Sequence, residues 1–145
     1  MADTSMGSPS NWAGYLLAKP DGTVFPHNLI KLETYDVLPN IREEIRAWRD
    51  DYTRNLHRIT ADGTKTKIMF ETVDNLDINE AFAIMNFFYS GESDHLQRQV
   101  TIRYWDPEYF HYETGVFYRP DIQFKIRDIT YGLNQKGFPI TLVEY

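Results

Sequence analysis

One stretch of the sequence decides the fold: Asp77-Ile-Asn-Glu-Ala-Phe-Ala-Ile-Met-Asn-Phe-Phe-Tyr-Ser-Gly91. Asp77 is a good helix N-cap, and Glu80 three residues later completes a reciprocal capping box. Gly91 stands where a left-handed residue often closes a helix. Between these ends, apolar side chains recur at helical spacing and form one wide face that leaves little of the helix for water. The residues of this face are Ile78, Ala81, Phe82, Met85, Phe88 and Tyr89, widened by Ala83, Ile84 and Phe87.

Strand-like segments lie on both sides of this helix. They alternate apolar and polar side chains, or are short apolar runs bounded by Pro, Gly and Asp. The segments are residues 13–19, 24–35, 65–73, 99–105, 109–119, 122–126 and 131–145. Two sets of residues each share one face of a strand, Ile68 with Phe70 and Thr72, and Val100 with Ile102 and Tyr104. We predict a mainly β (α+β) fold, an antiparallel β-sandwich or half-barrel flanked by one α-helix that seals its open side.

Two segments between residues 40 and 73 carry signals of their own. Asp62-Gly63-Thr64 is a turn sequence and predicts a long β-hairpin of residues 54–61 with residues 65–73. In residues 40–52, apolar residues recur at i, i+4, i+7 and i+11 after a cap signature, which indicates a helix, although an extended conformation stays open. Three arginines run beside this stripe. They form either a basic face for a partner or a solvated face balanced by four nearby carboxylates, and the charge pattern favours the solvated face.

Length and composition indicate one globular domain. At 145 residues, with 42% hydrophobic and 25% charged residues, the chain is long enough to bury a core. Aromatic residues make up 15% of the chain, a high proportion that fits strands and interfaces. The net charge is −6 with both signs interspersed, which argues against a general nucleic-acid binder held by phosphate contacts.

The N-terminal residues predict an arm in front of this domain. Residues 1–12 are small and polar and include Gly7 and Pro9, which predicts a flexible or extended arm with Trp12 as an anchor, followed by a single domain over residues 13–145. The chain has no Cys, so disulfides and thiolate metal sites are excluded. Neither a signal peptide nor a membrane-spanning run is expected, and the protein is expected in the cytosol or to leave it by a route other than secretion.

No motif of reaction chemistry stands out, so no catalytic, cofactor-binding or metal-binding residue is predicted and the chain is not expected to be an enzyme. His111 and Glu113 alternate on a strand and could share a metal, but no third ligand has a recognisable spacing, which favours a surface role for the pair. The acidic residues from Asp74 to Glu80 lack the central Gly and the spacing of a calcium loop. The four histidines lie in no nucleophile signature, and there is no glycine-rich phosphate loop.

The order of features along the chain resembles a family of small structural proteins encoded in the tail modules of long-tailed bacteriophages and prophages. The resemblance covers about residues 29 to 145 and includes no invariant functional motif. Its segments, with the capped helix between the first two, are Lys65-Thr-Lys-Ile-Met-Phe70, Val100-Thr-Ile-Arg-Tyr-Trp-Asp106, Tyr112-Glu-Thr-Gly-Val-Phe-Tyr118, Pro120-Asp121 and Ile140-Thr-Leu-Val-Glu-Tyr145.

This resemblance implies a tail-tube-like or minor tail protein, a non-enzymatic component of the tube, distal ring or baseplate region. It implies a location in the virion tail, after assembly in the cytoplasm of the bacterial host. Copies of the chain would form rings, with a hexamer as one candidate, beside other tail proteins. Double-stranded DNA would pass through the lumen without specific binding, and no membrane is involved.

Edge strands, the N-terminal arm and the long hairpin would bridge neighbouring copies. The candidate interface residues are Trp12, Trp48, Tyr52, Arg54, His57 and Trp105. A second class of function stays open, a monomeric β-barrel that binds a small apolar or sugar ligand; it predicts a thermal shift with ligand and no oligomer.

Overall fold

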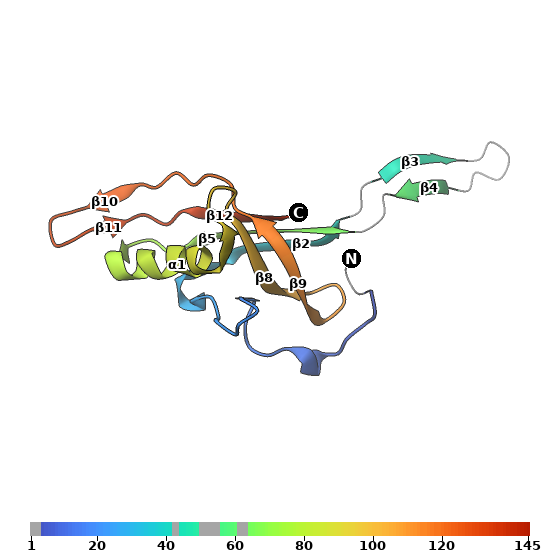
Figure 1. The fold of residues 1–145 in the computed structure, drawn as a ribbon, viewed down its shortest axis with the longest axis horizontal. Helices are drawn as coiled ribbons and strands as arrows, with labels where there is room; N and C mark the ends of the chain where they lie inside the picture. The colour runs from blue at the N-terminus through green and yellow to red at the C-terminus, as the bar shows by residue number, and fades with distance from the viewer. Residues whose placement is uncertain (1–3, 42–43, 50–55, 61–63) are drawn as a thin grey trace.

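The computed structural model describes residues 4–41, 44–49, 56–60 and 64–145, whose arrangement is shown in Figure 1. The helices are the 3-10 helices η1 (Pro9–Asn11) and η2 (His27–Leu29) and the α-helix α1 (Ile78–Gly91). The strands are β1 (Leu17–Ala18), β2 (Ile30–Ile41), β3 (Glu44–Arg49), β4 (Leu56–Thr60), β5 (Lys65–Thr72), β6 (Leu76–Asp77), β7 (Glu92–Asp94), β8 (Gln99–Asp106), β9 (His111–Tyr118), β10 (Ile126–Asp128), β11 (Asn134–Gln135) and β12 (Pro139–Glu144). The predicted mainly-β fold with one α-helix is confirmed over these residues.

The main sheet has seven strands and is antiparallel. Its order is β1-β8-β9-β12-β5-β2, and β7 also pairs with β8. β8 and β9 pair along their whole length, whereas β12 pairs with β9 only at Val143 and Glu144. Because this link is short, the sheet can turn there, and in Figure 1 the β8–β9 pair crosses the layer of β12, β5 and β2. The sheet therefore forms two layers of a sandwich around one core.

The core follows the two-residue period of the strands. On β5, Ile68, Phe70 and Thr72 are buried, as their alternation predicts. The predicted inward face of β8 is confirmed too, with Val100, Ile102 and Tyr104 buried. β9 adds Phe117, and β12 adds Ile140 and Leu142, so that both layers supply side chains to a single cluster.

Helix α1 covers one end of the sandwich. The Asp77 carboxylate accepts from the Glu80 backbone N–H at 2.8 Å, and the Glu80 carboxylate accepts from the Asp77 N–H at 3.2 Å, which confirms the capping box. The buried side of the helix is narrower than the wide apolar face suggested, because only Ile84, Phe87 and Phe88 are fully buried on it. In the described part of the chain, no helix has the length and apolarity needed to cross a membrane.

Gly91 has a different role from the predicted left-handed cap. It is the last residue of α1, and it does not belong to the residues with positive φ. A Cβ at this position would lie 2.7 Å from Lys19 Cδ and 3.2 Å from Val100 Cγ2. Glycine is therefore needed for close packing of the helix end against the chain around Lys19, rather than for its backbone freedom.

The helix indicated for residues 40–52 is wrong in the part that the structure describes. β2 continues to Ile41, and β3 follows over Glu44–Arg49, so the extended alternative is correct there. The predicted cap residue Asn40 has a φ of 54° and lies within β2. Apolar spacing at i, i+4 and i+7 does not by itself exclude a strand, and Ile and Trp both favour strands. Pairing with a distant segment decided the conformation.

The hairpin predicted for residues 54–61 with 65–73 also needs correction. β4 pairs with β3, where Trp48 lies opposite His57, and β5 pairs with β2 and β12. The long hairpin therefore consists of β2 and β3 returning as β4 and β5. The turn at Asp62-Gly63 lies outside the described residues. A turn sequence indicates a change of direction, but the partner of each strand depends on which apolar faces must be buried together.

Candidate assembly surfaces

The described sheet is open at both ends. Its first strand, β1, and its last, β2, are not paired with each other, so this sheet does not form a closed barrel. β2 is long and presents one edge of unpaired backbone groups, and Leu32, Leu38 and Ile41 on it are exposed. Natural proteins usually cover or disrupt such an edge, since it readily pairs with another chain. β2 is thus a candidate surface for contact with a neighbour.

The β3–β4 pair projects from the sandwich as a two-stranded extension, seen at the right of Figure 1. Of the six candidate interface residues, Trp48 and His57 lie here and face each other in the register of the two strands. Tyr52 and Arg54 lie outside the described residues. An isolated two-stranded ribbon is marginally stable in water, so contact with another surface would stabilise it.

A buried polar network holds the base of this extension. Asn40 is 3% exposed, and its Nδ2 donates to Asp106 Oδ2 at 2.9 Å and to Glu108 Oε1 at 3.2 Å. The Asn40 backbone N–H donates to Thr66 Oγ1 at 3.3 Å. A left-handed φ is uncommon outside glycine, but asparagine tolerates it better than most residues. Asn40 therefore ties the point where β2 leaves the sandwich to β5 and to the end of β8.

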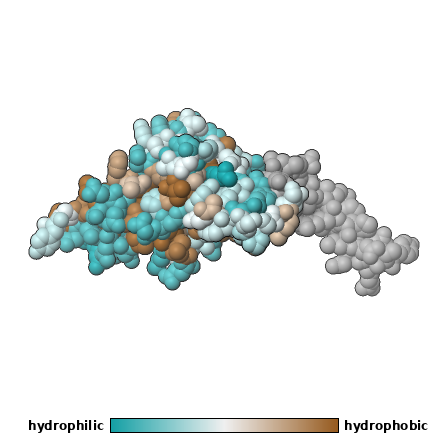
Figure 2. All heavy atoms as spheres, turned by 90° about the horizontal axis from the view of Figure 1, so that it is seen from below, coloured by the Kyte–Doolittle hydropathy of each residue, from teal (hydrophilic) through white to brown (hydrophobic). Residues whose placement is uncertain are grey.

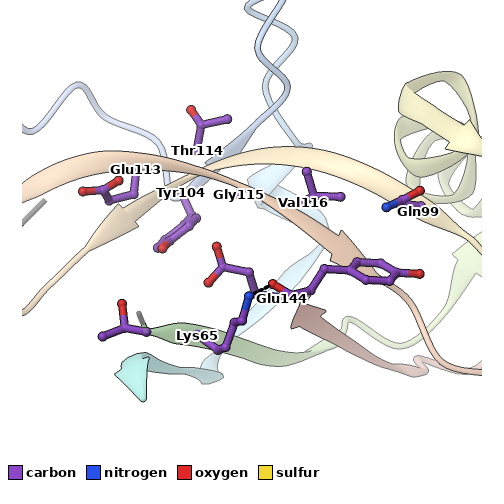
Figure 3. A pocket seen from close by; sticks show the side chains of 10 residues that line it. Lys65, Gln99, Tyr104, Glu113, Thr114, Gly115, Val116 and Glu144 are labelled. Carbon is purple, nitrogen blue, oxygen red and sulfur yellow. Dashed lines mark hydrogen bonds between the residues drawn. The ribbon is translucent and has the colours of Figure 1, made fainter. Parts of the chain in front are cut away.

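The same network continues toward the C-terminal strand. The hydroxyls of Thr66 and Tyr104 are 3.0 Å apart, and the Thr66 N–H donates to Glu144 Oε1 at 2.9 Å. Burial raises the pKa of the Tyr104 hydroxyl and also that of the Glu144 carboxyl. Beside the network lies a polar hollow of about 430 Å³, shown in Figure 3, where Lys65 donates to the backbone oxygen of Tyr145.

The N-terminal segment and the β8–β9 hairpin together build an aromatic cluster. Trp12 meets Trp105 edge-on, with ring centroids 5.3 Å apart, and it stacks on Tyr112 at 6.4 Å. Tyr15 also stacks on Tyr112, with ring centroids 4.6 Å apart, and the Tyr112 hydroxyl donates to the Tyr15 carbonyl at 2.8 Å. The structure therefore brings together two of the six candidate residues, Trp12 and Trp105, from positions distant in sequence.

Backbone contacts keep this N-terminal segment against the β8–β9 turn. The Gly7 N–H donates to the Tyr109 carbonyl at 2.6 Å, and Asn11 Nδ2 donates to the Phe110 carbonyl at 3.0 Å. A Cβ on Gly7 would lie 2.0 Å from the Phe110 oxygen, so the close approach requires glycine. Trp12 remains 46% exposed despite these contacts. Its outer face is available to a neighbouring molecule.

Two features of the structure were not predicted from the sequence. One is the Asn40 network, for which the only signal was a polar residue followed by Ile41 in an otherwise strand-compatible run. The other is an exposed apolar stripe on α1, formed by Ile78, Phe82 and Tyr89. The wide apolar face was visible in the sequence, but the sequence did not show which part of it would stay outside.

The structure shows how His111 and Glu113, considered as metal ligands from the sequence, lie relative to each other. His111 Nδ1 lies 3.4 Å from Glu113 Oε1, and the two side chains are only 15% and 16% exposed, so the pair is partly buried and not on the surface as predicted. Among the residues with described placement, no group of three or more His, Asp or Glu side chains is arranged to hold a metal. The arrangement instead offers surfaces: a free strand edge, a projecting ribbon, an aromatic cluster and an apolar helix stripe.

Fold and surfaces thus define a mainly-β protein with an open sheet and a projecting strand pair. Residues 10–145 match the family described as "Family of unknown function (DUF6711)", and the chain belongs to this family. Comparison with curated proteins gave no match. Among solved structures, the chain is similar to one described as "Tail of empty GTA particle computed with helical refinement, C6 symmetry". The TM-score is 0.53 at 11% identity, covering 96% of this chain and 94% of that one, and the similarity shows a shared fold.

Proposed function

We propose that this protein is a non-enzymatic structural subunit of a bacteriophage or phage-like tail, of the tail-tube type. The observation that carries the proposal is the fold shared along nearly the whole chain with a component of a C6-symmetric tail particle. A fold alone does not define a function. The open sheet and the projecting ribbon support the same role independently, because both are surfaces that a single copy leaves uncovered.

The proposed mechanism is geometric. The β3–β4 extension and the free β2 edge are different surfaces, so contacts made through them join unlike patches of successive copies. Head-to-tail contacts of this kind close into a ring when the rotation between copies divides a full turn, and otherwise continue as a helix. Six copies per ring is the number that we propose, by analogy with the symmetry of the similar tail particle.

Candidate residues from the sequence take defined places in this proposal. Trp48 and His57 belong to the projecting β3–β4 pair and would contact the next copy, and the exposed face of Trp12 beside Trp105 would contact another neighbour. Tyr52 and Arg54, which lie outside the described residues, keep the interface role predicted from the sequence. DNA would pass through the lumen of stacked rings without specific binding, and the net charge of −6 would disfavour sticking to phosphates. The rings would be located in the virion tail, after assembly in the bacterial cytoplasm with other tail proteins.

The test is the assembly state, measured by size-exclusion chromatography with light scattering and by negative-stain imaging. The protein would be purified alone and after co-expression with the products of the adjacent genes. We expect ring-shaped particles or tubes in at least one of these samples. A species that stays monomeric in both would overturn the proposal.

A pair of variants links assembly to the projecting ribbon. Trp48→Ala is expected to abolish the rings while leaving the circular dichroism spectrum unchanged. The matched control is Tyr131→Ala, which removes another aromatic side chain, 99% exposed and at the other end of the molecule. Rings that form equally well with Trp48→Ala would exclude the ribbon as the contact.

A further inference from the structure

The outer face of α1 is an apolar surface that the fold itself does not cover. Ile78 and Tyr89 are each 59% exposed and Phe82 is 66% exposed, with Met85 half-buried between them. From Ile78 to Tyr89 the stripe runs about 16 Å along the helix axis, at a rise of about 1.5 Å per residue. In Figure 2, hydrophobic residues form patches on the half of the molecule that holds α1 and the β10–β11 hairpin.

Two hollows flank this stripe and share Phe82 and Met85. The larger hollow, of about 610 Å³, lies between the helix and two segments, one carrying Arg98 before β8 and the other carrying Arg119 after β9. The smaller, of about 310 Å³, lies between the helix and the β10–β11 hairpin, where Phe124 contributes to its wall. Because Phe82 and Met85 line both hollows, the hollows adjoin each other along the helix, and together they are called the groove.

The end of the groove at Tyr89 is lined by Arg98 and Arg119 together with Glu92. The Glu92 carboxylate is 4% exposed and already occupied, since His95 Nδ1 lies 2.8 Å from one of its oxygens and Arg119 Nη2 lies 3.5 Å from the other. The Arg98 side chain is 37% exposed, and its partner Asp121 is 94% exposed. An ion pair exposed to this degree is weak, so the Arg98 guanidinium can exchange Asp121 for another carboxylate.

Arg119 lies at the same end of the groove and has a hydrogen-bond donor without an acceptor among the described residues. Its side chain is 11% exposed, and its Nε is buried without a hydrogen-bond acceptor among the described residues. Burial also lowers the pKa of the Arg119 guanidinium, because the charge has lost much of its hydration. A desolvated guanidinium gains more from an added negative charge than one in water does.

The opposite end of the groove carries carboxylates. It begins at the N-terminus of α1, where the Asp77 and Glu80 carboxylates form the capping box. Between Val73 and Tyr89 the sequence contains three carboxylates, Asp74, Asp77 and Glu80, and no Lys or Arg. The groove is therefore apolar along its length, and its two ends differ: arginines lie near Tyr89, and the capping-box carboxylates lie near Ile78.

We propose that this groove binds a short segment of a different protein, one that presents consecutive apolar side chains with a carboxylate at one end. The carboxylate lies against Arg98 and Arg119, and the apolar side chains fill the two hollows beside Phe82 and Met85. An extended segment of about five residues spans the stripe, at about 3.3 Å per residue. A protein segment fits better than a small molecule, since a single small ligand would fill one hollow and leave the other open.

This inference does not rest on ring formation, so the two proposals fail separately. The experiment uses the full-length protein, immobilised and screened against a displayed library of random heptapeptides. We expect enriched peptides to share two or more apolar residues next to an Asp or Glu. A selection that enriches no peptide, or enriches peptides without an acidic residue, overturns the proposal.

Variants then locate the binding, with an enriched peptide as the probe in fluorescence anisotropy. Phe82→Asp and Arg98→Glu are each expected to weaken binding by roughly tenfold or more, as for anchor residues of an interface. The control Ile129→Asp changes another exposed apolar residue, 74% exposed between β10 and β11 and outside the lining of both hollows, and is expected to stay within about twofold. Equal weakening by Phe82→Asp and Ile129→Asp would place the peptide elsewhere and overturn the proposal.

Two further outcomes identify other occupants. If 3-phenylpropionate, an apolar ring with a carboxylate, competes as well as the peptide on a molar basis, the groove is a small-molecule site. If the purified protein is a dimer that Phe82→Asp converts to a monomer, the occupant is a second copy of the chain. Either result overturns the assignment to a different protein.

Discussion

Replacing Asn40 tests the network that holds the projecting ribbon. Asn40→Ala removes two hydrogen bonds from Nδ2 to carboxylates, at 2.9 Å to Asp106 and 3.2 Å to Glu108. Hydrogen bonds to charged groups contribute about 1.5–3 kcal/mol each, although the second of these is longer and less buried. Alanine also adopts the left-handed conformation, here with φ of 54°, at a cost of about 1–2 kcal/mol. We expect the free energy of unfolding to fall by about 3–5 kcal/mol.

Asn40→Gly separates the two causes. Glycine loses the same hydrogen bonds but has no left-handed strain, and it gains about 0.5–1 kcal/mol of unfavourable backbone entropy relative to alanine. The glycine variant should therefore be more stable than the alanine variant by about 0.5–1 kcal/mol. Urea unfolding followed by tryptophan fluorescence measures both. A loss below about 1 kcal/mol for Asn40→Ala would show that the network does not stabilise the fold, refuting the reasoning.

Three further predictions concern the core, the helix cap and pH. Phe88→Ala empties a fully buried site and should cost about 3–5 kcal/mol in urea unfolding, whereas Phe82→Ala, on the exposed stripe, should cost less than about 1 kcal/mol; similar losses would contradict the assignment of the two helix faces. Asp77→Ala removes the capping box and should lower the unfolding free energy by about 1 kcal/mol. An unchanged thermal midpoint would show that the capping box does not stabilise the protein. Burial raises the pKa of Glu144 above 4.5, so its protonated form is favoured in the folded state, and this contribution to stability is present below pH 4.5 and lost as the pH rises through the folded pKa. The unfolding free energy of Glu144→Gln relative to the natural protein should therefore rise over this pH window, and a difference that does not change with pH would contradict it.

Much of the local structure could be predicted because its causes lie within a few residues. The capping box depends on two side chains three positions apart, Asp77 and Glu80, and helix α1 forms where their pattern places it. The inward faces of β5 and β8 follow from strict alternation around Ile68 and Ile102. In residues 40–52 the local pattern indicated a helix but left an extended conformation open, and in the described part of this segment the pairing of β3 with β4 decided for the strand.

For the candidate surfaces, too, the sequence indicated single residues, and the structure showed which of them come together. Trp12 and Trp105 were both selected as exposed aromatic residues, yet only the structure shows that they touch, at 5.3 Å, across ninety-three positions of sequence. The Asn40 network joins four segments and has no signature along the chain. The sequence singled out Gly91 as the end of the helix. The structure shows that a glycine fits there because the Lys19 side chain lies close by, and not because the backbone is left-handed.

The amino-acid sequence by itself determined where α1 begins and which faces of β5 and β8 are apolar, since these properties arise from side chains close together along the chain. Tertiary structure alone decided the order of strands in the sheet and the side of α1 that stays exposed. These outcomes depend on which distant surfaces can be buried together. Phe82 and Phe88 are both phenylalanines, six positions apart on one helix. Packing against the sheet buries Phe88 in the core and leaves Phe82 exposed for a partner.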